Sequence, residues 1–168
     1  MVMHNAESTV LIVDDNKANL SLLIDQLLAQ GFQLMVAESG GSALERVHFR
    51  IPDIILLDVR MPGIDGFETC RRLKTDPAVA DVPVIFLSSL TDADDKIQGF
   101  QAGGVDYIAK PLDFAEVLLR VRTHLSLRRL QRSLTQSNAE LEQRVAARTI
   151  ELQAEIARRT QSEAEKSL

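Results

Sequence analysis

Residues 10–19, VLIVDDNKAN, run from four consecutive apolar residues directly into two aspartates. A short run of Val, Leu and Ile is typical of a strand that is buried on both faces of a parallel sheet. Two adjacent carboxylates repel each other, so this strand must end near solvent or a cation. The stretch therefore predicts a buried strand whose end carries a charged site.

Four more short apolar runs follow, and they alternate with amphipathic segments that are typical of helices. The runs are residues 34–37, 54–57, 84–87 and 107–109, and the helical segments are residues 18–30, 42–50, 67–75, 93–102 and a last one from about 113. Gly31 and Gly103 stand where helices would end, and Asp113 stands where the last one would begin. The alternation predicts an α/β fold, a five-stranded parallel doubly wound sheet with helices on both faces.

Composition changes sharply near residue 111. All eight glycines and all five prolines lie at or before Pro111, and no aromatic residue follows Phe114. The remaining residues contain nothing that breaks a helix and little that builds a core. We therefore predict an N-terminal tail over residues 1–8, a globular domain over 9–125 and a long helix over 126–168.

The long helix has a period of eleven residues. Residues 139–149, AELEQRVAART, align with residues 150–160, IELQAEIARRT, so that apolar pairs recur every eleven positions. Eleven residues in three turns keep an apolar stripe nearly straight along a helix. The recurring pairs are Leu130 with Leu134, Leu141 with Val145, and Leu152 with Ile156.

Such a stripe favours a parallel homodimeric coiled coil, although a solvated single helix held by local charge pairs remains the alternative. Asn138, Arg148 and Thr149 lie near the stripe, so we expect the pairing to be marginal. The pattern stops at Glu163 and Ser167, which suggests either that the natural protein continues or that the helix frays.

Charge and composition exclude several classes of protein. Residues 1–123 carry 11 Lys and Arg against 18 Asp and Glu, whereas residues 124–168 carry 8 against 6, and no basic stripe suited to nucleic acid stands out. Cys70 is the only cysteine, which excludes an internal disulfide. With no apolar run long enough for a membrane span and no secretion signal, we expect a cytoplasmic protein without membrane insertion.

Polar residues follow four of the five predicted strands. Because the carboxyl ends of parallel strands share one edge of a sheet, these residues should converge on one pocket. Taken singly, an aspartate there is often a helix cap, a serine an ordinary loop residue and a lysine a surface residue. Taken together they predict a site, and its members are Asp14, Asp15, Asp58, Ser88, Ser89 and Lys110.

Three crowded carboxylates raise one another's pKa unless a cation keeps them ionised. Mg²⁺ suits such a site because it binds oxygen ligands, typically one or two carboxylates with waters and phosphate oxygens. A carboxylate beside the metal can attack phosphorus and form an aspartyl phosphate. The lysine and a serine hydroxyl would then neutralise and bind the phosphoryl oxygens.

These residues resemble the receiver domain of two-component response regulators, over residues 9 to about 125. The motifs that carry the resemblance are LIVDDN at 11–16, IILLDVRMPGIDG at 54–66, PVIFLSS at 83–89 and DYIAKPLD at 106–113. The resemblance implies the flavodoxin-like (βα)5 receiver fold. The residues after 125 resemble, less specifically, signalling helices that join receivers to histidine kinase, PAS, diguanylate cyclase or phosphatase modules.

The resemblance implies a role for each matching residue. Asp58 would accept a phosphoryl group from a histidine kinase or a phosphotransfer protein. Asp14, Asp15, Asp58 and the backbone carbonyl of Arg60 would form the Mg²⁺ site, with Asp14 acting largely through water. Ser88 and Lys110 would contact the phosphoryl group, Lys110 being positioned by a cis bond to Pro111, and Tyr107 would be the aromatic switch that turns inward. Gly104 departs from the family, which commonly has Ala there, and could soften the fifth strand.

The sequence thus predicts a phosphoacceptor that switches a dimeric output helix. We do not expect an enzyme, apart from the transfer of a phosphoryl group to the chain itself and the hydrolysis of that group. Two alternatives remain. A Mg²⁺-dependent aspartyl phosphatase would have an acidic residue two places beyond its nucleophile, where Arg60 stands. A dimerisation module that never takes phosphate would keep the fold and the coiled coil without the chemistry.

Overall fold

The structure is a computed structural model that describes residues 8–89 and 93–167. Strands and helices alternate along the chain, and the last helix is by far the longest. The strands are β1 (Thr9–Val13), β2 (Gln33–Ala37), β3 (Ile54–Asp58), β4 (Val84–Ser88) and β5 (Asp106–Ala109). The helices are α1 (Lys17–Ala29), α2 (Gly40–Phe49), α3 (Gly66–Thr75), α4 (Ala93–Gln101) and α5 (Phe114–Lys166).

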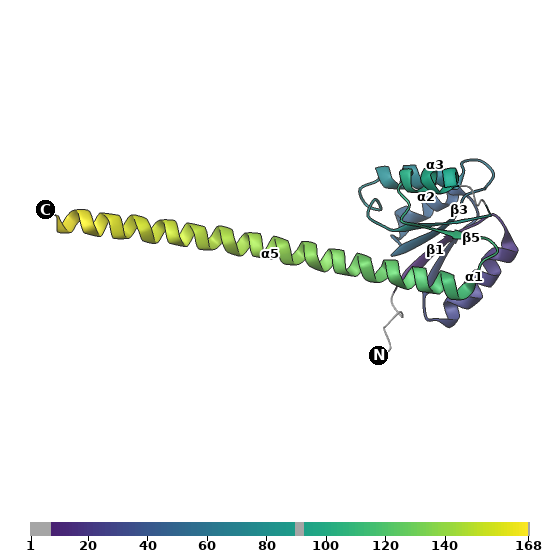
Figure 1. Cartoon of the computed structure of the whole chain (residues 1–168), viewed down its shortest axis with the longest axis horizontal. Coiled ribbons are helices and arrows are strands. Elements are labelled where there is room, and N and C mark those ends of the chain that lie inside the picture. The colour runs from purple at the N-terminus through teal and green to yellow at the C-terminus, as the bar shows by residue number, and fades with distance from the viewer. Residues whose placement is uncertain (1–7, 90–92, 168) are drawn as a thin grey trace. The chain divides into compact units, whose positions relative to one another are not determined.

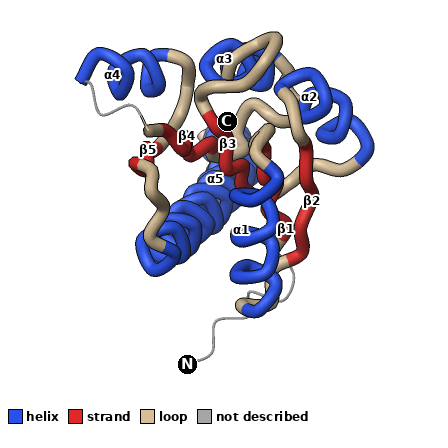
Figure 2. Tube along the Cα trace, turned by 90° about the vertical axis from the view of Figure 1, so that its right-hand side faces the viewer, coloured by secondary structure: helices blue, strands red, loops and turns tan. Residues whose placement is uncertain are grey.

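The five strands form one parallel sheet in the order β2-β1-β3-β4-β5. Helices α1 and α5 cover one face of the sheet, and α2, α3 and α4 lie on the other (Figures 1 and 2). Every residue of β1, β3 and β4 is buried. Alternate residues of these strands belong to two separate apolar clusters, one on each face. The prediction of a doubly wound parallel α/β fold is confirmed.

Local signals in the sequence place the ends of the helices. Asn16, Ser39 and Asp65 each accept backbone N–H groups at the start of a helix, as N-caps do. Asp113 accepts the N–H of Ala115 at 3.0 Å at the start of α5. Gly31 and Gly103 have φ angles of +87° and +107°, in the left-handed region that glycine adopts at helix ends.

The chain forms two compact units that meet between Ser126 and Leu127. The first unit contains the sheet and the start of α5, and the second unit contains the remainder of α5. Almost all of the expected N-terminal tail, residues 1–8, lies outside the described residues. Among residues 8–89 and 93–167, no helix has a segment both long enough and apolar enough for a membrane span.

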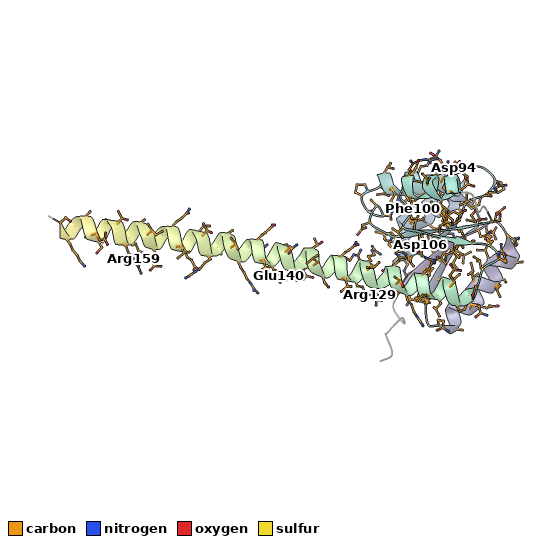
Figure 3. The ribbon with its side chains drawn as sticks, in the orientation of Figure 1. Asp94, Phe100, Asp106, Arg129, Glu140 and Arg159 are labelled. Atoms are coloured by element: carbon orange, nitrogen blue, oxygen red, sulfur yellow. The ribbon has the colours of Figure 1, made fainter. Side chains whose placement is uncertain are left out.

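Over residues 127–167, the described part of the second unit, no apolar side chain is buried. Leu130 and Val145 expose 66% and 64% of their surface, and Ile150 exposes 67%. Charged side chains such as Glu140 and Arg159 project from the same helix (Figure 3). Pairs such as Arg159 with Glu155, at 2.7 Å and four residues apart, support the isolated helix only weakly.

The packing of Phe86, at the centre of β4, explains why position 104 holds a glycine where the resemblance leads one to expect alanine. Its ring packs edge-on against Phe67 of α3, with centroids 5.2 Å apart. A Cβ atom at Gly104 would lie 2.7 Å from Phe86 Cδ2, and one at Gly99 of α4 would lie 3.1 Å from the same atom. The ring therefore fills the space that an alanine methyl group at position 104 would need.

We predict that Gly104→Ala lowers the free energy of unfolding by about 1–3 kcal/mol, because the methyl group overpacks the buried ring. Adding Phe86→Leu should recover part of that loss. Gly41→Ala is the control, because position 41 is helical with open space around its Cβ, and this change should stabilise the fold by up to about 1 kcal/mol. Urea unfolding measures all three variants, and a neutral Gly104→Ala would contradict the overpacking argument.

Candidate functional site

The parallel sheet brings the predicted site residues to one edge. Asp14 directly follows β1, Asp58 ends β3, Ser88 ends β4 and Lys110 directly follows β5. Asp58 is in register with Leu87 of β4, and Ser88 is in register with Ala109 of β5. Backbone pairing across neighbouring strands therefore sets the positions of these side chains, although up to 96 residues separate them along the chain.

Lys110 makes an ion pair with each of two buried aspartates. Its Nζ atom lies 3.2 Å from Asp14 Oδ2 and 3.2 Å from Asp58 Oδ1. The peptide bond that follows Lys110 is cis, as the resemblance implied. The Asp14 side chain is fully buried, and its Oδ1 also accepts the backbone N–H of Asn16 at 2.9 Å. Each ionised oxygen of Asp14 thus has a donor, as a buried carboxylate requires.

Asp58 has the most perturbed carboxyl group of the site. Burial, together with the negative charge of Asp14, raises the pKa of Asp58 from 3.8 to about 6, although Lys110 opposes the shift. The group is therefore ionised at neutral pH but only by a small margin. A carboxylate that is costly to ionise gains strongly from any additional cation.

The three carboxylates fit a hard divalent cation. One oxygen from each of Asp14, Asp15 and Asp58 lies within 4.8 Å of the others. Two oxygens that bind the same Mg²⁺ ion lie at most about 4.2 Å apart, so only small movements are needed to bring all three to one ion. Asp15 is exposed, unlike the other two, and keeps the site open to water and to a phosphate group.

The structure also places the remaining predicted residues. Ser88 is buried at the end of β4, beside the edge where Asp58 lies. Arg60 is two residues beyond Asp58 with an exposed side chain, and the role of its backbone carbonyl stays a prediction. Tyr107 is only 9% exposed, and Lys96 Nζ lies 5.9 Å from the centre of its ring. The Tyr107 side chain is thus largely buried next to α4, and its role as a switch stays a prediction.

Two features near the site were not predicted. Asn19, in the first turn of α1, donates to Asp14 Oδ2 at 3.4 Å. Asn19 and Lys110 also line a largely apolar groove of about 220 Å³, whose other walls come from α1 and from the segment after β5. The available signal for Asn19 was its position: it is a polar residue in the first turn of the helix that follows Asp14. No sequence pattern indicated the groove, whose remaining lining residues are Leu22, Leu23, Pro111, Leu112 and Phe114.

A polar network at the start of β5 was also missed. Asp106 accepts hydrogen bonds from Arg120 Nη1 at 2.9 Å and from its neighbour's backbone N–H at 2.8 Å, and it pairs with His124 Nε2 at 2.9 Å. Burial alone would raise the pKa of Asp106, but the hydrogen bonds from His124, Tyr107 N–H and Arg120 outweigh it and hold the pKa below its usual range. The spacing of Glu116, Arg120 and His124 along one face of α5 was the available signal.

Comparison with known proteins decides the family. The profile of the response regulator receiver domain matches residues 10–122, which is more than half of the chain. The chain belongs to the response regulator receiver domain family. The three-carboxylate cluster, the lysine after β5 and the parallel sheet are therefore those of a receiver domain of two-component signalling.

The relatives are longer proteins that share the receiver domain. Response regulator PleD of Caulobacter vibrioides is 43% identical over 114 residues, which are 68% of this chain and 25% of PleD. A probable cyclic di-GMP phosphodiesterase of Vibrio cholerae is 37% identical over 147 residues, which are 88% of this chain and 33% of that protein. The chain thus spans about a quarter to a third of these relatives.

Solved structures agree with the fold. The crystal structure of a putative response regulator from Chloroflexus aurantiacus is 37% identical, with a TM-score of 0.68. It covers 71% of this chain and 98% of its own chain. The similarity therefore accounts for the first unit and leaves most of α5 unmatched.

The raised pKa of Asp58 has a measurable consequence for stability. The folded state binds this proton more tightly than the unfolded state, so ionising Asp58 costs stability as the pH rises from about 4 to about 6, and the full cost remains above pH 6. In EDTA, Asp58→Asn should raise the free energy of unfolding at pH 8 by roughly 1–3 kcal/mol and should have no such effect near pH 3.5.

Asp25→Asn, at an exposed position of α1, is the control and should change stability by less than about 0.5 kcal/mol. Saturating Mg²⁺ should shrink the difference at pH 8, because the cation stabilises only the protein that keeps Asp58. A gain from Asp58→Asn that does not change with pH would contradict this account.

Proposed function

We propose that this receiver domain is phosphorylated on Asp58, in a reaction that depends on Mg²⁺, by a histidine kinase or a histidine phosphotransfer protein. The observation that carries the proposal is the position of Asp58, a buried carboxylate that lies 3.2 Å from Lys110 inside a cluster of three carboxylates. The chain acts as a phosphoacceptor, and its own chemistry is limited to taking up and losing that group.

The transfer exchanges one bond to phosphorus for another. The P–N bond to the donor histidine breaks as a P–O bond to a carboxylate oxygen of Asp58 forms, and the bonding electron pair stays on the imidazole nitrogen. Because Asp58 is ionised above about pH 6, no base is needed to activate it. Lys110 Nζ, which already lies 3.2 Å from Asp58, forms an ion pair with the phosphoryl oxygens. Ser88, at the end of the neighbouring strand, donates a hydrogen bond from its hydroxyl to one of them. Bound Mg²⁺ supplies further positive charge for the same oxygens.

Backbone contacts connect the acceptor to the switch residues. Lys110 N–H donates to the carbonyl oxygen of Ser88 at 2.8 Å, so the ends of β4 and β5 are tied together. When Ser88 and Lys110 move toward the phosphoryl group, this bond draws β5 with them. Tyr107, which lies three residues before Lys110 in β5, moves with the strand. The largely buried Tyr107 ring would then be repositioned by the movement of β5, which is the switch that we propose.

The groove beside the site offers a place for the phosphate donor. Leu22 of α1 lines it with 59% of its surface exposed, and Lys110 connects it directly to Asp58. A helix that presents a phosphorylated histidine can rest its apolar side there while its histidine reaches the acceptor. A small phosphate donor needs no such support.

We predict that acetyl phosphate with Mg²⁺ adds one phosphoryl group to the chain, and that Asp58→Asn abolishes the mass increase. Lys110→Ala should slow uptake roughly a hundredfold, because it removes one preorganised positive charge. Leu22→Asp should leave uptake from acetyl phosphate unchanged but slow transfer from any histidine donor that phosphorylates the native chain. An unmodified native chain would favour a purely structural role, and uptake that survives Asp58→Asn would place the acceptor elsewhere.

For the second unit we propose a parallel homodimer formed along the apolar stripe. The stripe comprises exposed aliphatic residues with spacings of three, four and seven, and water contact with so many large apolar side chains is costly for a lone helix. A helix of this length also gains little from its local charge pairs. The members of the stripe are Leu127, Leu130, Leu134, Leu141, Val145, Leu152 and Ile156.

The dimeric helix would carry the signal to an effector module. The match to the Vibrio cholerae protein covers 88% of the chain and so must extend beyond Ser126 into the second unit, whereas the match to PleD covers only 68%. The support for this output is that α5 is a single helix from Phe114 to Lys166, so a shift at its start can alter the pairing of the stripe. An effector that acts on cyclic di-GMP is the output that the Vibrio cholerae relative favours, because its name describes a probable cyclic di-GMP phosphodiesterase.

We predict that the full chain is a dimer at micromolar concentration and that Leu141→Asp with Val145→Asp makes it monomeric. Ile150→Asp is the matched control, because Ile150 is as exposed as the stripe residues but lies on another side of the helix. Analytical ultracentrifugation measures all three proteins. Equal dissociation by the control would show that the stripe is not the interface. If the stripe is the interface, cysteine cross-linking at positions 141 and 145 with and without beryllofluoride tests its coupling to Asp58.

A further inference from the structure

Polar residues interrupt the apolar stripe at a regular interval. Asn138, Thr149 and Thr160 follow one another at eleven-residue spacing, each four places after an aliphatic residue, and Asn138 and Thr149 also lie three places before one. Leu127 holds that same position in the first repeat of the second unit. Burying a polar side chain in a helix interface costs stability unless it forms a hydrogen bond.

The two threonines have already met that requirement inside their own helix. Thr149 Oγ1 donates to the carbonyl oxygen of Val145 at 2.8 Å, and Thr160 Oγ1 donates to that of Ile156 at 2.9 Å. With its hydroxyl bonded locally, each threonine can turn its methyl group toward a partner. Asn138 carries a side-chain amide with two donors and one acceptor oxygen, which a single bond to its own backbone would not satisfy.

The apolar part of the stripe cannot distinguish two registers. Because it repeats every eleven residues, a partner helix that slips by eleven still pairs Leu141 with Leu152 and Val145 with Ile156. Asn138 removes this equivalence, since among parallel pairings only the in-register copy presents a second Asn138 amide at the same height. Resting on the proposed dimer, we infer that Asn138 is the residue that sets the register of α5 in a parallel pair with a second copy of this chain.

The charges beside the stripe agree with a parallel second copy. Arg148 and Arg159 border the stripe on one side, and Glu142 borders it on the other. In a parallel pair the basic border of one helix faces the acidic border of its partner, whereas an antiparallel pair would set arginine against arginine. The existing pairs of these arginines with Glu151 and Glu155 are solvent-exposed, so they contribute little and can rearrange.

Cross-linking in the full chain tests the inference. Two variants, Leu141→Cys and Leu152→Cys, are mixed and oxidised, and a bond between positions 141 and 152 reports a slip of eleven residues. Cys70 is fully buried, and burial raises the pKa of its thiol to about 11, so it does not compete. With Asn138 present we expect only the 141–141 and 152–152 bonds.

Adding Asn138→Leu to both chains should increase the 141–152 product roughly tenfold or more, because the unpaired amide that penalises the slipped register is gone. Thr149→Leu is the matched control and should leave that product at background, since Thr149 already bonds its own helix. A slipped product that is equally abundant with Asn138 or Leu at position 138 would overturn the inference. Absence of every cross-link together with a monomeric native chain would overturn the proposed dimer as well.

Discussion

One ammonium group shared by two buried carboxylates organises the catalytic edge of this receiver domain. Lys110 Nζ lies 3.2 Å from both Asp14 and Asp58, which repel each other and are held close by the sheet. The single positive charge is insufficient, because burial and Asp14 still raise the pKa of Asp58 to about 6. The site therefore carries negative charge that is not fully compensated, which lowers the stability of the folded protein and favours the binding of a divalent cation. The free energy that this buried charge costs the folded protein is partly recovered when a cation binds.

The deficit is tolerable because the sheet beneath it is rigid. All residues of β1, β3 and β4 are buried between helices on both faces, so the strand ends that carry Asp14, Asp58 and Ser88 cannot relax apart without opening the core. The backbone bond from Lys110 N–H to the Ser88 carbonyl extends this constraint to β5. The proposed phosphoryl group on Asp58 would thus displace the neighbouring strand ends slightly, and the packed sheet would transmit these displacements.

The sequence revealed what depends on periodicity and strand ends. Apolar runs and caps such as Asn16 and Asp65 predicted the elements, and the parallel arrangement then placed Asp14, Asp58 and Lys110 together. Features that depend on packing between distant side chains had no comparable signal. The hydrogen bond from Asn19 to Asp14 and the apolar groove near Lys110 required the positions of α1 and of the segment after β5. The sequence shows the departure at Gly104, but only the structure shows the Phe86 ring in the space of the missing methyl group.

The second unit follows a different physical logic from the first. The receiver domain specifies one structure by close packing, whereas in the proposed dimer the repeat in α5 would permit several pairings of similar energy and leave the choice to a few polar side chains. In the proposed dimer, a stripe interrupted by polar residues would pair weakly, and weak pairing would suit a helix that carries a signal. When two registers differ by only about 1–2 kcal/mol, the small energy available from a displaced strand end is enough to change which one is populated. A more apolar stripe would pair more tightly but would no longer respond to the state of Asp58.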